Sequence, residues 1–475
     1  MTNAGAQTLQ TTDSRSGKRV LAVVGFLVFV EFSSGFLQGF YLPVINEIKE
    51  HLNATDASIA WFITVQSLAA GVCVPVLAKL GDIFGHRRIL RIAILAVLVG
   101  TALVAFAPNL PLVLFGRVLC GPLAVWLPLE LAIVHNQIHG ETARRAIGML
   151  ISALTIGALI GSLAAGAASA LIGSLVVRLA IPVIIVAISA VFVFTLVPES
   201  TVRANPRIDW PGFILLAVFM LVLLWGINML KASPGLGVVL VVVALVLMAC
   251  FVWFELRADA PAINLRVPFS NRLWPVYATS FLFGIVLFGT QSITTTFLAG
   301  KPELVGYGFG LTAGQISLFT GLNTLLGAVG AAVYAFIAQK ITLRGVLMTG
   351  TGAIAVAQLL LIFGHAAFPV VIVSVALAGL GGGFLLGGLP AATAEVAPAD
   401  ETGIATGIYN SVKTLGGAVA GAIFASVLAA FVIPEAHAAS ATGYVTVWII
   451  CAVATGACPF ILLLLRSSHS RTPVA

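Results

Sequence analysis

Charged residues are scarce in this chain. Asp, Glu, Lys and Arg make up 9% of its 475 residues, against roughly 25% in soluble domains. Hydrophobic residues make up 60% and the mean hydropathy is +1.11. This composition excludes a soluble enzyme and indicates an integral membrane protein. The net charge of +7 does not point to nucleic acid, because no polar stretch is longer than a loop and binding needs a basic face on a soluble domain.

Catalytic and metal-binding patterns are also missing. The five cysteines lie in apolar runs without the paired spacing of disulfides or zinc sites, so we interpret them as small apolar fillers. The sequence has no HExxH, GxSxG or P-loop motif, and no pair of Asp or His residues spaced for intramembrane catalysis. We therefore expect no catalytic residue, no metal and no cofactor, and an intramembrane enzyme is only a remote alternative.

Long apolar runs are what the chain has in abundance. A membrane-spanning helix needs about 20 apolar residues, whereas a closed barrel shows short alternating strands. The sequence therefore predicts an all-α membrane protein with fourteen transmembrane helices. The expected spans are 20–41, 58–78, 89–106, 112–133, 146–171, 175–196, 210–230, 236–254, 274–298, 314–338, 346–363, 368–389, 403–432 and 444–465.

The distribution of positive charge predicts the topology. Most Lys and Arg residues lie in the N-terminal tail and in every second loop, which predicts cytoplasmic termini by the positive-inside rule. These include Lys79, Arg87, Arg88, Arg91, Arg144, Arg145, Arg257, Arg266 and Arg272. Long polar connections around two helices predict a 6 + 2 + 6 layout. The expected parts are a tail (1–19), a six-helix bundle (20–197), a linker with two extra helices (198–272), a second six-helix bundle (273–466) and a C-terminal tail (467–475). The loop "AKLGDIFGHRRIL" has a faint counterpart in "AQKITLRGVL", as expected of a transporter built from repeats.

Two motifs carry a resemblance to a known family. "AKLGDIFGHRRIL" resembles the cytoplasmic signature of the major facilitator superfamily, and "FGRVLCG" resembles its fourth-helix motif with an intramembrane arginine, here Arg117. The signature matches at Leu80, Asp82, Gly85, Arg87 and Leu90, and departs at Ala78, Ile83 and His86. In the fourth-helix motif, Cys120 departs from the usual Gln.

Further segments are similar to the fourteen-span drug:proton antiporter family. "VPES", "RIDWPGFILLAV" and "FELRADAPAINLRVP" resemble the joints around its two extra helices, and "GIATGIYNSVKTLGGAVAGAIFASVL" resembles its thirteenth helix, with Lys413 at a position that is often arginine. The likeness runs from residue 20 to 465. It implies a fourteen-helix major facilitator fold and a proton-coupled exporter working by alternating access.

Glu31 and Lys413 stand in apolar spans, each about 15 to 16 Å deep at roughly 1.5 Å per residue. Such charges should face the bundle interior or a wet cavity. Glu31 lies one turn before Ser34, the position that corresponds to the family's usual first-helix acid, so its proposed role rests on depth and charge. We expect proton coupling or cation binding by Glu31 and Lys413, with a static Glu–Lys or Glu–Arg pair as the alternative. The resemblance implies that Arg117 takes part in proton handling; the alternative is that it reaches the outer surface.

Other candidates are assigned more loosely. The resemblance implies that Asp82, Gly85, Arg87 and Arg88 form a gating motif, and the alternative is a solvated loop. Glu130 is expected near the cytoplasmic surface, where a carboxylate costs little. Gly148, Gly157, Gly161 and Gly166 predict a tight helix contact. The candidates for lining a substrate cavity, or for packing between helices, are Gln38, Gln66, Gln291, Asn323, Asn410, Phe36 and Tyr409.

These features together predict a proton-coupled antiporter that exports amphipathic or hydrophobic compounds such as drugs, dyes or antibiotics. Its partners would be a small hydrophobic substrate, protons and the lipid bilayer, with no nucleic acid, and it would act as a monomer in the bacterial cytoplasmic membrane. The alternative is a proton symporter or uniporter that takes up a small organic solute.

Overall fold

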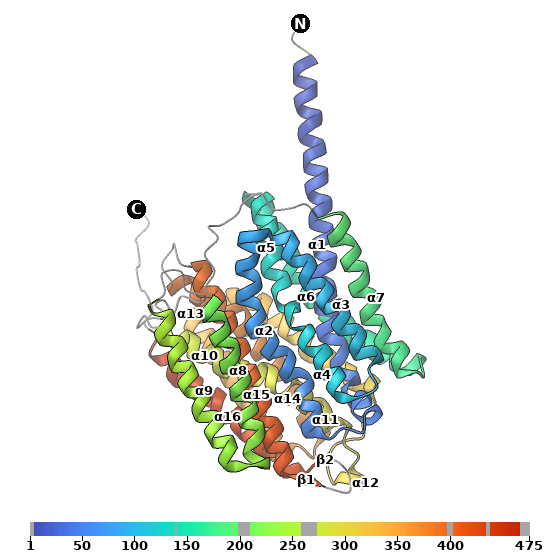
Figure 1. Cartoon of the computed structure of the whole chain (residues 1–475), viewed down its shortest axis with the longest axis vertical. Helices are drawn as coiled ribbons and strands as arrows, with labels where there is room; N and C mark the ends of the chain where they lie inside the picture. The colour runs from blue at the N-terminus through green and yellow to red at the C-terminus, as the bar shows by residue number, and fades with distance from the viewer. Residues whose placement is uncertain are drawn as a thin grey trace.

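The computed structural model describes residues 4–137, 140–197, 210–257, 273–396, 402–433 and 438–465. The predicted joints at 198–209 and 258–272 and the side chains of Arg144, Arg145, Arg266 and Arg272 lie outside the described residues. Helices dominate the rest, apart from one short hairpin of two strands (Figure 1).

The first part of the chain forms a helical bundle, which we call the N-terminal bundle. Its elements are α1 (Ala4–His51), α2 (Asp56–Phe84), α3 (His86–Phe106), α4 (Leu110–Leu119), η1 (Gly121–Val125), α5 (Trp126–Gln137), α6 (Gly140–Leu171) and α7 (Leu175–Thr195). The helices α8 (Trp210–Ala232) and α9 (Pro234–Glu255) follow.

The last part forms the C-terminal bundle. Its elements are α10 (Trp274–Gly289), α11 (Gln291–Ala299), α12 (Pro302–Val305), α13 (Ala313–Gly364), α14 (Phe368–Val396), α15 (Thr402–Ala430), β1 (Val432–Ile433), β2 (Ala438–Ala439) and α16 (Ala441–Leu463). The strands pair antiparallel, with Val432 opposite Ala439. We call the end of the molecule with β1, β2 and α12 the hairpin end, and the opposite end, where α2 meets α3, the Gly85 end (Figure 1).

Twelve described helices are long and apolar enough to cross a membrane. The prediction of an all-helical fold is therefore confirmed, and the predicted spans lie in helical segments, although 112–133 is divided among α4, η1 and α5 and 274–298 between α10 and α11. α13 joins two predicted spans across a kink at Thr342, whose φ is 69°, and α8 carries a shorter apolar stretch, Trp210–Leu223. α1 continues ten residues beyond its predicted end at 41 and passes through Pro43. A proline removes one ladder hydrogen bond, which packing against neighbouring helices tolerates in a membrane bundle.

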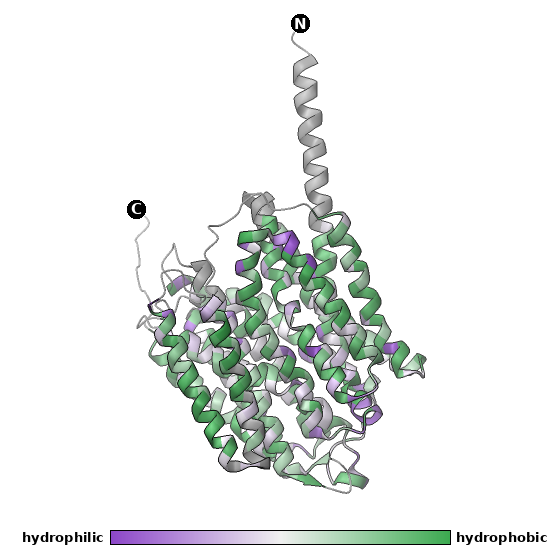
Figure 2. Cartoon of the chain, viewed as in Figure 1, coloured by the Kyte–Doolittle hydropathy of each residue, from purple (hydrophilic) through white to green (hydrophobic). Residues whose placement is uncertain are grey.

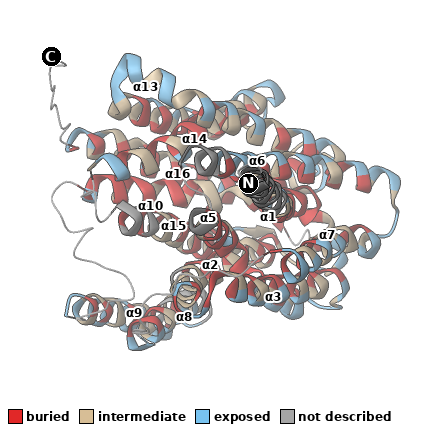
Figure 3. Cartoon of the chain, turned by 90° about the horizontal axis from the view of Figure 1, so that it is seen from above, coloured by how far each residue is buried: buried red, intermediate tan, exposed pale blue. Residues whose placement is uncertain are grey.

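The two bundles have separate apolar cores. One lies mainly in α1–α7 and the other mainly in α10–α16. A third cluster, with Leu68, Phe219 and Ala418 among its members, packs α8 and α9 against α2 and α15, and these two helices stand at the edge of the molecule in Figure 3.

The outer faces of the helices are apolar too (Figure 2). Large side chains such as Leu221, Leu245 and Val453 are more than half exposed, whereas buried residues concentrate between the helices (Figure 3). An exposed apolar surface of this extent is stable only against lipid. The chain is therefore a multi-pass membrane protein.

Close glycine contacts hold α1 against α6. A Cβ at Gly35 or Gly39 would clash with the backbone of α6, and one at Gly157 or Gly161 would clash with the backbone of α1. The predicted tight contact is thus confirmed for these two α6 glycines. Gly166 makes a similar close contact with Ser317 of α13, but the prediction is wrong for Gly148, which meets nothing within 4 Å.

Candidate functional site

Two buried carboxyl groups meet inside the N-terminal bundle. Glu31 on α1 and Glu130 on α5 are 1% and 0% exposed, and their carboxyl groups lie within interaction range of each other. Oε2 of Glu31 and both carboxyl oxygens of Glu130 have no well-formed hydrogen bond. Among the described residues, no Lys, Arg or His lies within ion-pair distance of either acid. We call these two residues the acid pair.

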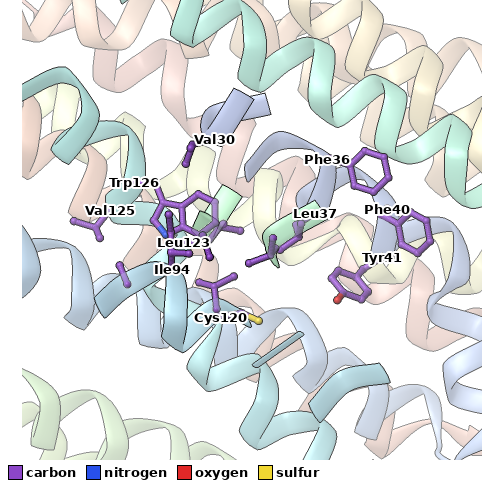
Figure 4. Close-up of a cluster of buried hydrophobic side chains, with 14 of the residues drawn as sticks. Val30, Phe36, Leu37, Phe40, Tyr41, Ile94, Cys120, Leu123, Val125 and Trp126 are labelled. Carbon is purple, nitrogen blue, oxygen red and sulfur yellow. The ribbon is translucent and has the colours of Figure 1, made fainter. Parts of the chain in front are cut away.

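The prediction for Glu130 was therefore wrong. Counting residues from the helix end placed it near the surface, but burial depends on the face that a residue occupies. Trp126 of α5 and Val30 of α1 belong to the same cluster of buried apolar side chains (Figure 4). Glu130 follows Trp126 by four residues, so both occupy nearly the same face of the helix. The acid pair is thus set among apolar side chains, including the fully buried Leu27, Val30 and Trp126.

Arg117 is held away from the acid pair. Its Nε donates to the carbonyl of Phe62 at 3.1 Å and an Nη atom donates to Gln66. The guanidinium lies 4.1 Å from the ring centroid of Phe62 and 4.9 Å from that of Tyr41. At 4% exposure the alternative of an arginine at the outer surface is wrong. Tyr41 is ten residues beyond Glu31, about 15 Å along α1, so Arg117 does not pair with Glu31 here.

Lys413 occupies the C-terminal bundle. Its side chain is 9% exposed, and Nζ lies 5.0 Å from the ring centroid of Tyr409, one turn earlier on α15. The Tyr409 hydroxyl is buried without a hydrogen-bond partner. Within the described parts of the chain no carboxylate lies within ion-pair distance of Lys413. The static Glu31–Lys413 pair is therefore not formed in this structure.

The remaining cavity candidates are dispersed. Gln38 is exposed and lies seven residues after Glu31, on the same face of α1. Asn323 donates to the carbonyl of Val375 at 3.0 Å and so ties α13 to α14. Phe36 packs its ring against Phe40, with centroids 5.5 Å apart. Two further candidates are half-buried, Gln291 and Asn410.

The predicted gating motif forms a corner at the Gly85 end. Gly85, with φ 105°, ends α2 and begins α3, a conformation that favours glycine. Asp82 is exposed and contacts His86 at 3.0 Å. Arg87 donates to the carbonyl of Phe194 on α7 at 2.9 Å, and Arg88 is exposed. In this structure the motif therefore fixes the α2–α3 corner to the end of α7.

A cluster that sequence reasoning missed joins the bundles at the hairpin end. Asp56, the first residue of α2, accepts hydrogen bonds from Lys49 Nζ at 2.8 Å, from the Ala439 backbone at 2.7 Å and from the Tyr444 hydroxyl at 3.0 Å. The burial of Tyr307 and the charge of the neighbouring Asp56 raise the pKa of Tyr307. Its phenol group therefore stays neutral and can donate a hydrogen bond. We call Lys49, Asp56, Ala439 and Tyr444 the Asp56 cluster.

Other contacts close the same end. Asn46 of α1 donates to the carbonyl of Thr295 at 3.0 Å. Ser162 of α6 donates to the carbonyl of Ser317 at 3.1 Å and also contacts the hydroxyl of Thr320. The two bundles are therefore linked by polar contacts at the hairpin end, and each contains buried ionisable groups.

Comparison with known proteins assigns the family. The model of the Major Facilitator Superfamily matches residues 27–301 and 282–475, so the chain belongs to this superfamily and is a membrane transporter.

Relatives with different described roles match it to similar degrees. The uridine/deoxyuridine transporter of Lactococcus lactis subsp. cremoris is 26% identical over 72% of each chain. The quinolone resistance protein NorB of Staphylococcus aureus is 25% identical over 86% of this chain and 87% of its own.

Solved structures share the fold. A crystal structure of the nucleoside transporter NupG has a TM-score of 0.64 at 15% identity, covering 93% of this chain and 98% of its own. An auto-inhibited peptide transporter of the POT family has a TM-score of 0.69 at 16% identity, covering 95% and 99%. At these identities the structures establish the fold and leave the substrate and the mode of transport open.

Proposed function

We propose that this protein is a proton-coupled antiporter that exports amphipathic or hydrophobic organic compounds across the bacterial cytoplasmic membrane. In this proposal it is a monomer that crosses the bilayer fourteen times, because α13 supplies two spans and α8 supplies another. The Gly85 end faces the cytoplasm, as the basic residues Lys79, Arg87, Arg88 and Arg91 there favour. The hairpin end then faces outward, and its closure corresponds to one of the two states of alternating access.

The acid pair is the observation that carries the proposal. Two ionised carboxylates side by side in an apolar interior repel each other, so at least one of the two must hold a proton. Water or a cationic group reaching the pair would change the number of protons that it holds. Coupling of proton flow to transport requires a site that binds and releases protons as water or substrate gains and loses access to it.

The direction of transport and the substrates rest on two further observations. The interior is largely apolar with few charges, which suits hydrophobic compounds better than sugars or phosphates. NorB, a quinolone resistance protein related over most of the chain, also favours drug export.

A proton symporter or uniporter for a small organic solute is the second candidate. It is favoured by the relative described as a uridine/deoxyuridine transporter. An acid pair serves symport as well as antiport, so the two candidates differ in the direction and the identity of the cargo.

Proteoliposomes under an imposed pH gradient separate the two candidates. For antiport we expect a lipophilic dye to move against the proton flow, with loss of movement on adding a protonophore or in Glu31→Gln. Glu303→Gln, an exposed acid on α12, is the matched control and should transport normally. Movement of uridine together with protons, without dye transport, would favour the second candidate. Equal dye transport by Glu31→Gln and the wild type would refute coupling at the acid pair.

A further inference from the structure

Lys413 is a buried cation, and the coupling proposed for the acid pair does not involve it. A charged side chain in a membrane interior costs about 2.5 to 3.5 kcal/mol on insertion scales. In the described part of the chain, the only partner of the Lys413 ammonium group is the ring of Tyr409, whose centroid lies 5.0 Å from Nζ. A cation–π contact offsets only part of the cost of removing an ammonium group from water. Among the residues that the structure describes, Lys413 therefore has no counter-charge of the kind that a structural lysine at this depth would have.

The helix that carries Lys413, α15, packs against both bundles. The Lys413 carbonyl lies against Gly284 of α10, where a Cβ would clash with it, and Gly421, eight residues further on, packs against Thr64 of α2. Residues eight apart on a helix differ by about 80° in direction. Lys413 therefore lies where α15 packs against α10 of its own bundle, and the direction toward α2 is about 80° away around the helix.

The chemistry of this place favours an anionic ligand group. An ammonium group has only donors, and the neighbouring Tyr409 hydroxyl is buried and unpartnered, so it is free to donate a second hydrogen bond. An oxygen of a carboxylate would accept from both and would supply the missing counter-charge. With one cation at the site, a single negative charge is matched and a polyphosphate is not.

We infer that Lys413 and Tyr409 form an anion-binding subsite, and that the substrates include amphipathic compounds with one carboxylate, zwitterions among them. The inference deepens the proposed function by naming a substrate class. It does not depend on the direction of transport. The acids and the lysine lie in opposite bundles, so the carboxylate of a bound zwitterion would be directed to the C-terminal bundle.

Equilibrium binding to the protein in lipid nanodiscs tests this directly. The two probes are a rhodamine with a free carboxylate and its methyl ester, followed by fluorescence anisotropy. We expect the wild type to bind the carboxylate form more tightly. Lys413→Met should raise its Kd at least about tenfold, as expected for the loss of a charge-assisted contact, and leave the ester within about twofold. Lys413→Arg should retain the preference.

Two further variants sharpen the result. Tyr409→Phe removes only the hydroxyl and should weaken carboxylate binding about threefold, which keeps the test available if Lys413→Met does not fold. Lys340→Met is the matched control, because Lys340 also lies over an aromatic ring, 4.7 Å from that of Phe336, but on the exposed surface. It should bind both probes as the wild type does.

The inference fails if the wild type does not prefer the carboxylate, or if Lys413→Met weakens both probes equally, which would make Lys413 structural. Binding needs no pH gradient, so failure of proton coupling in proteoliposomes would leave this result standing. Conversely, coupled dye transport without carboxylate preference would refute the subsite and preserve the proposed function.

Discussion

The Asp56 cluster offers the sharpest perturbation, Asp56→Asn, which keeps the shape of the side chain and removes its charge. Asp56 Oδ1 receives Lys49 from its own bundle, while Oδ2 receives Ala439 and Tyr444 from the other. In asparagine one of these two positions is an NH₂ group, which cannot accept. Either a hydrogen bond between the bundles is lost, or the amide turns and loses the Lys49 contact, and the bonds that remain lack charge assistance.

The magnitude follows from these contacts. A hydrogen bond to a charged group is worth about 1.5 to 3 kcal/mol, and the Asp56 side chain is 1% exposed, so solvent compensates little for the loss. We expect the closed hairpin end to be destabilised by about 2 kcal/mol, a shift of about thirtyfold in the closed-to-open ratio. If about 5% of molecules are open in the wild type, about 60% would be open in the variant.

Spin labels at Asn53→Cys and Thr442→Cys, in a cysteine-free background, measure the shift. Both positions are exposed at the hairpin end, one in each bundle. Double electron–electron resonance in nanodiscs should show a longer distance gaining population in Asp56→Asn. Glu50→Gln, an exposed acid at the same end, should leave the distribution unchanged. An Asp56→Asn distribution that matches the wild type would show that other contacts hold this end closed, and an equal shift in Glu50→Gln would assign the effect to general surface charge.

The remaining predictions concern the acid pair, the α1–α6 contact and Lys413. If the two acids share one proton-binding site, each single variant should abolish its function. Proton release on substrate binding, measured with a pH indicator, should then fall to the same low level in Glu31→Gln, in Glu130→Gln and in the double variant. Additive losses in the double variant would contradict a shared site. Gly157→Ala should destabilise the protein by several kcal/mol because its Cβ would meet the backbone of Phe32, whereas Gly148→Ala, which meets nothing, should be neutral or stabilising. Thermal unfolding in detergent compares the two, and equal melting temperatures would argue against the close contact. Lys413→Met should raise the melting temperature, since it replaces an unpaired buried charge with an apolar chain of similar length; a lower melting temperature would indicate a counter-charge not seen here.

The helices could be predicted from the sequence because the bilayer imposes them. A run of about 20 apolar residues must satisfy its backbone internally, so the pattern that marks a span also fixes its secondary structure. The predicted spans differ from the observed helices mainly at their ends. The first predicted span ends at 41, but α1 continues through Pro43 to His51, because packing between helices overrides a local break.

The site was less predictable because it depends on contacts between distant residues. The apolar run around Glu31 indicated a buried acid, yet its neighbour Glu130 was misjudged, since the face of α5 follows from the whole bundle. Asp56 was not among the predicted site residues, and its partners Ala439 and Tyr444 lie more than 380 positions away in the chain. Local pattern carries no signal for such a contact.

The packing of α1 on α6 links these separate features. Gly35 and Gly39 of α1 lie directly on the backbone of α6, so the two helices cannot slide apart without losing contacts along several turns. Glu31 stands one turn before this contact on α1, and Ser162, which joins the C-terminal bundle at Ser317, stands directly after it on α6. A change at the acid pair that displaces α1 would therefore displace α6 and strain the junction between the bundles. Among the described residues, α1 meets α2 through side chains, with Lys49 bonded to Asp56 and the Tyr41 ring against that of Phe62, whereas its close glycine contacts are with the backbone of α6. The geometry thus favours α6 as the element that connects the protonation of Glu31 to the closure of the hairpin end.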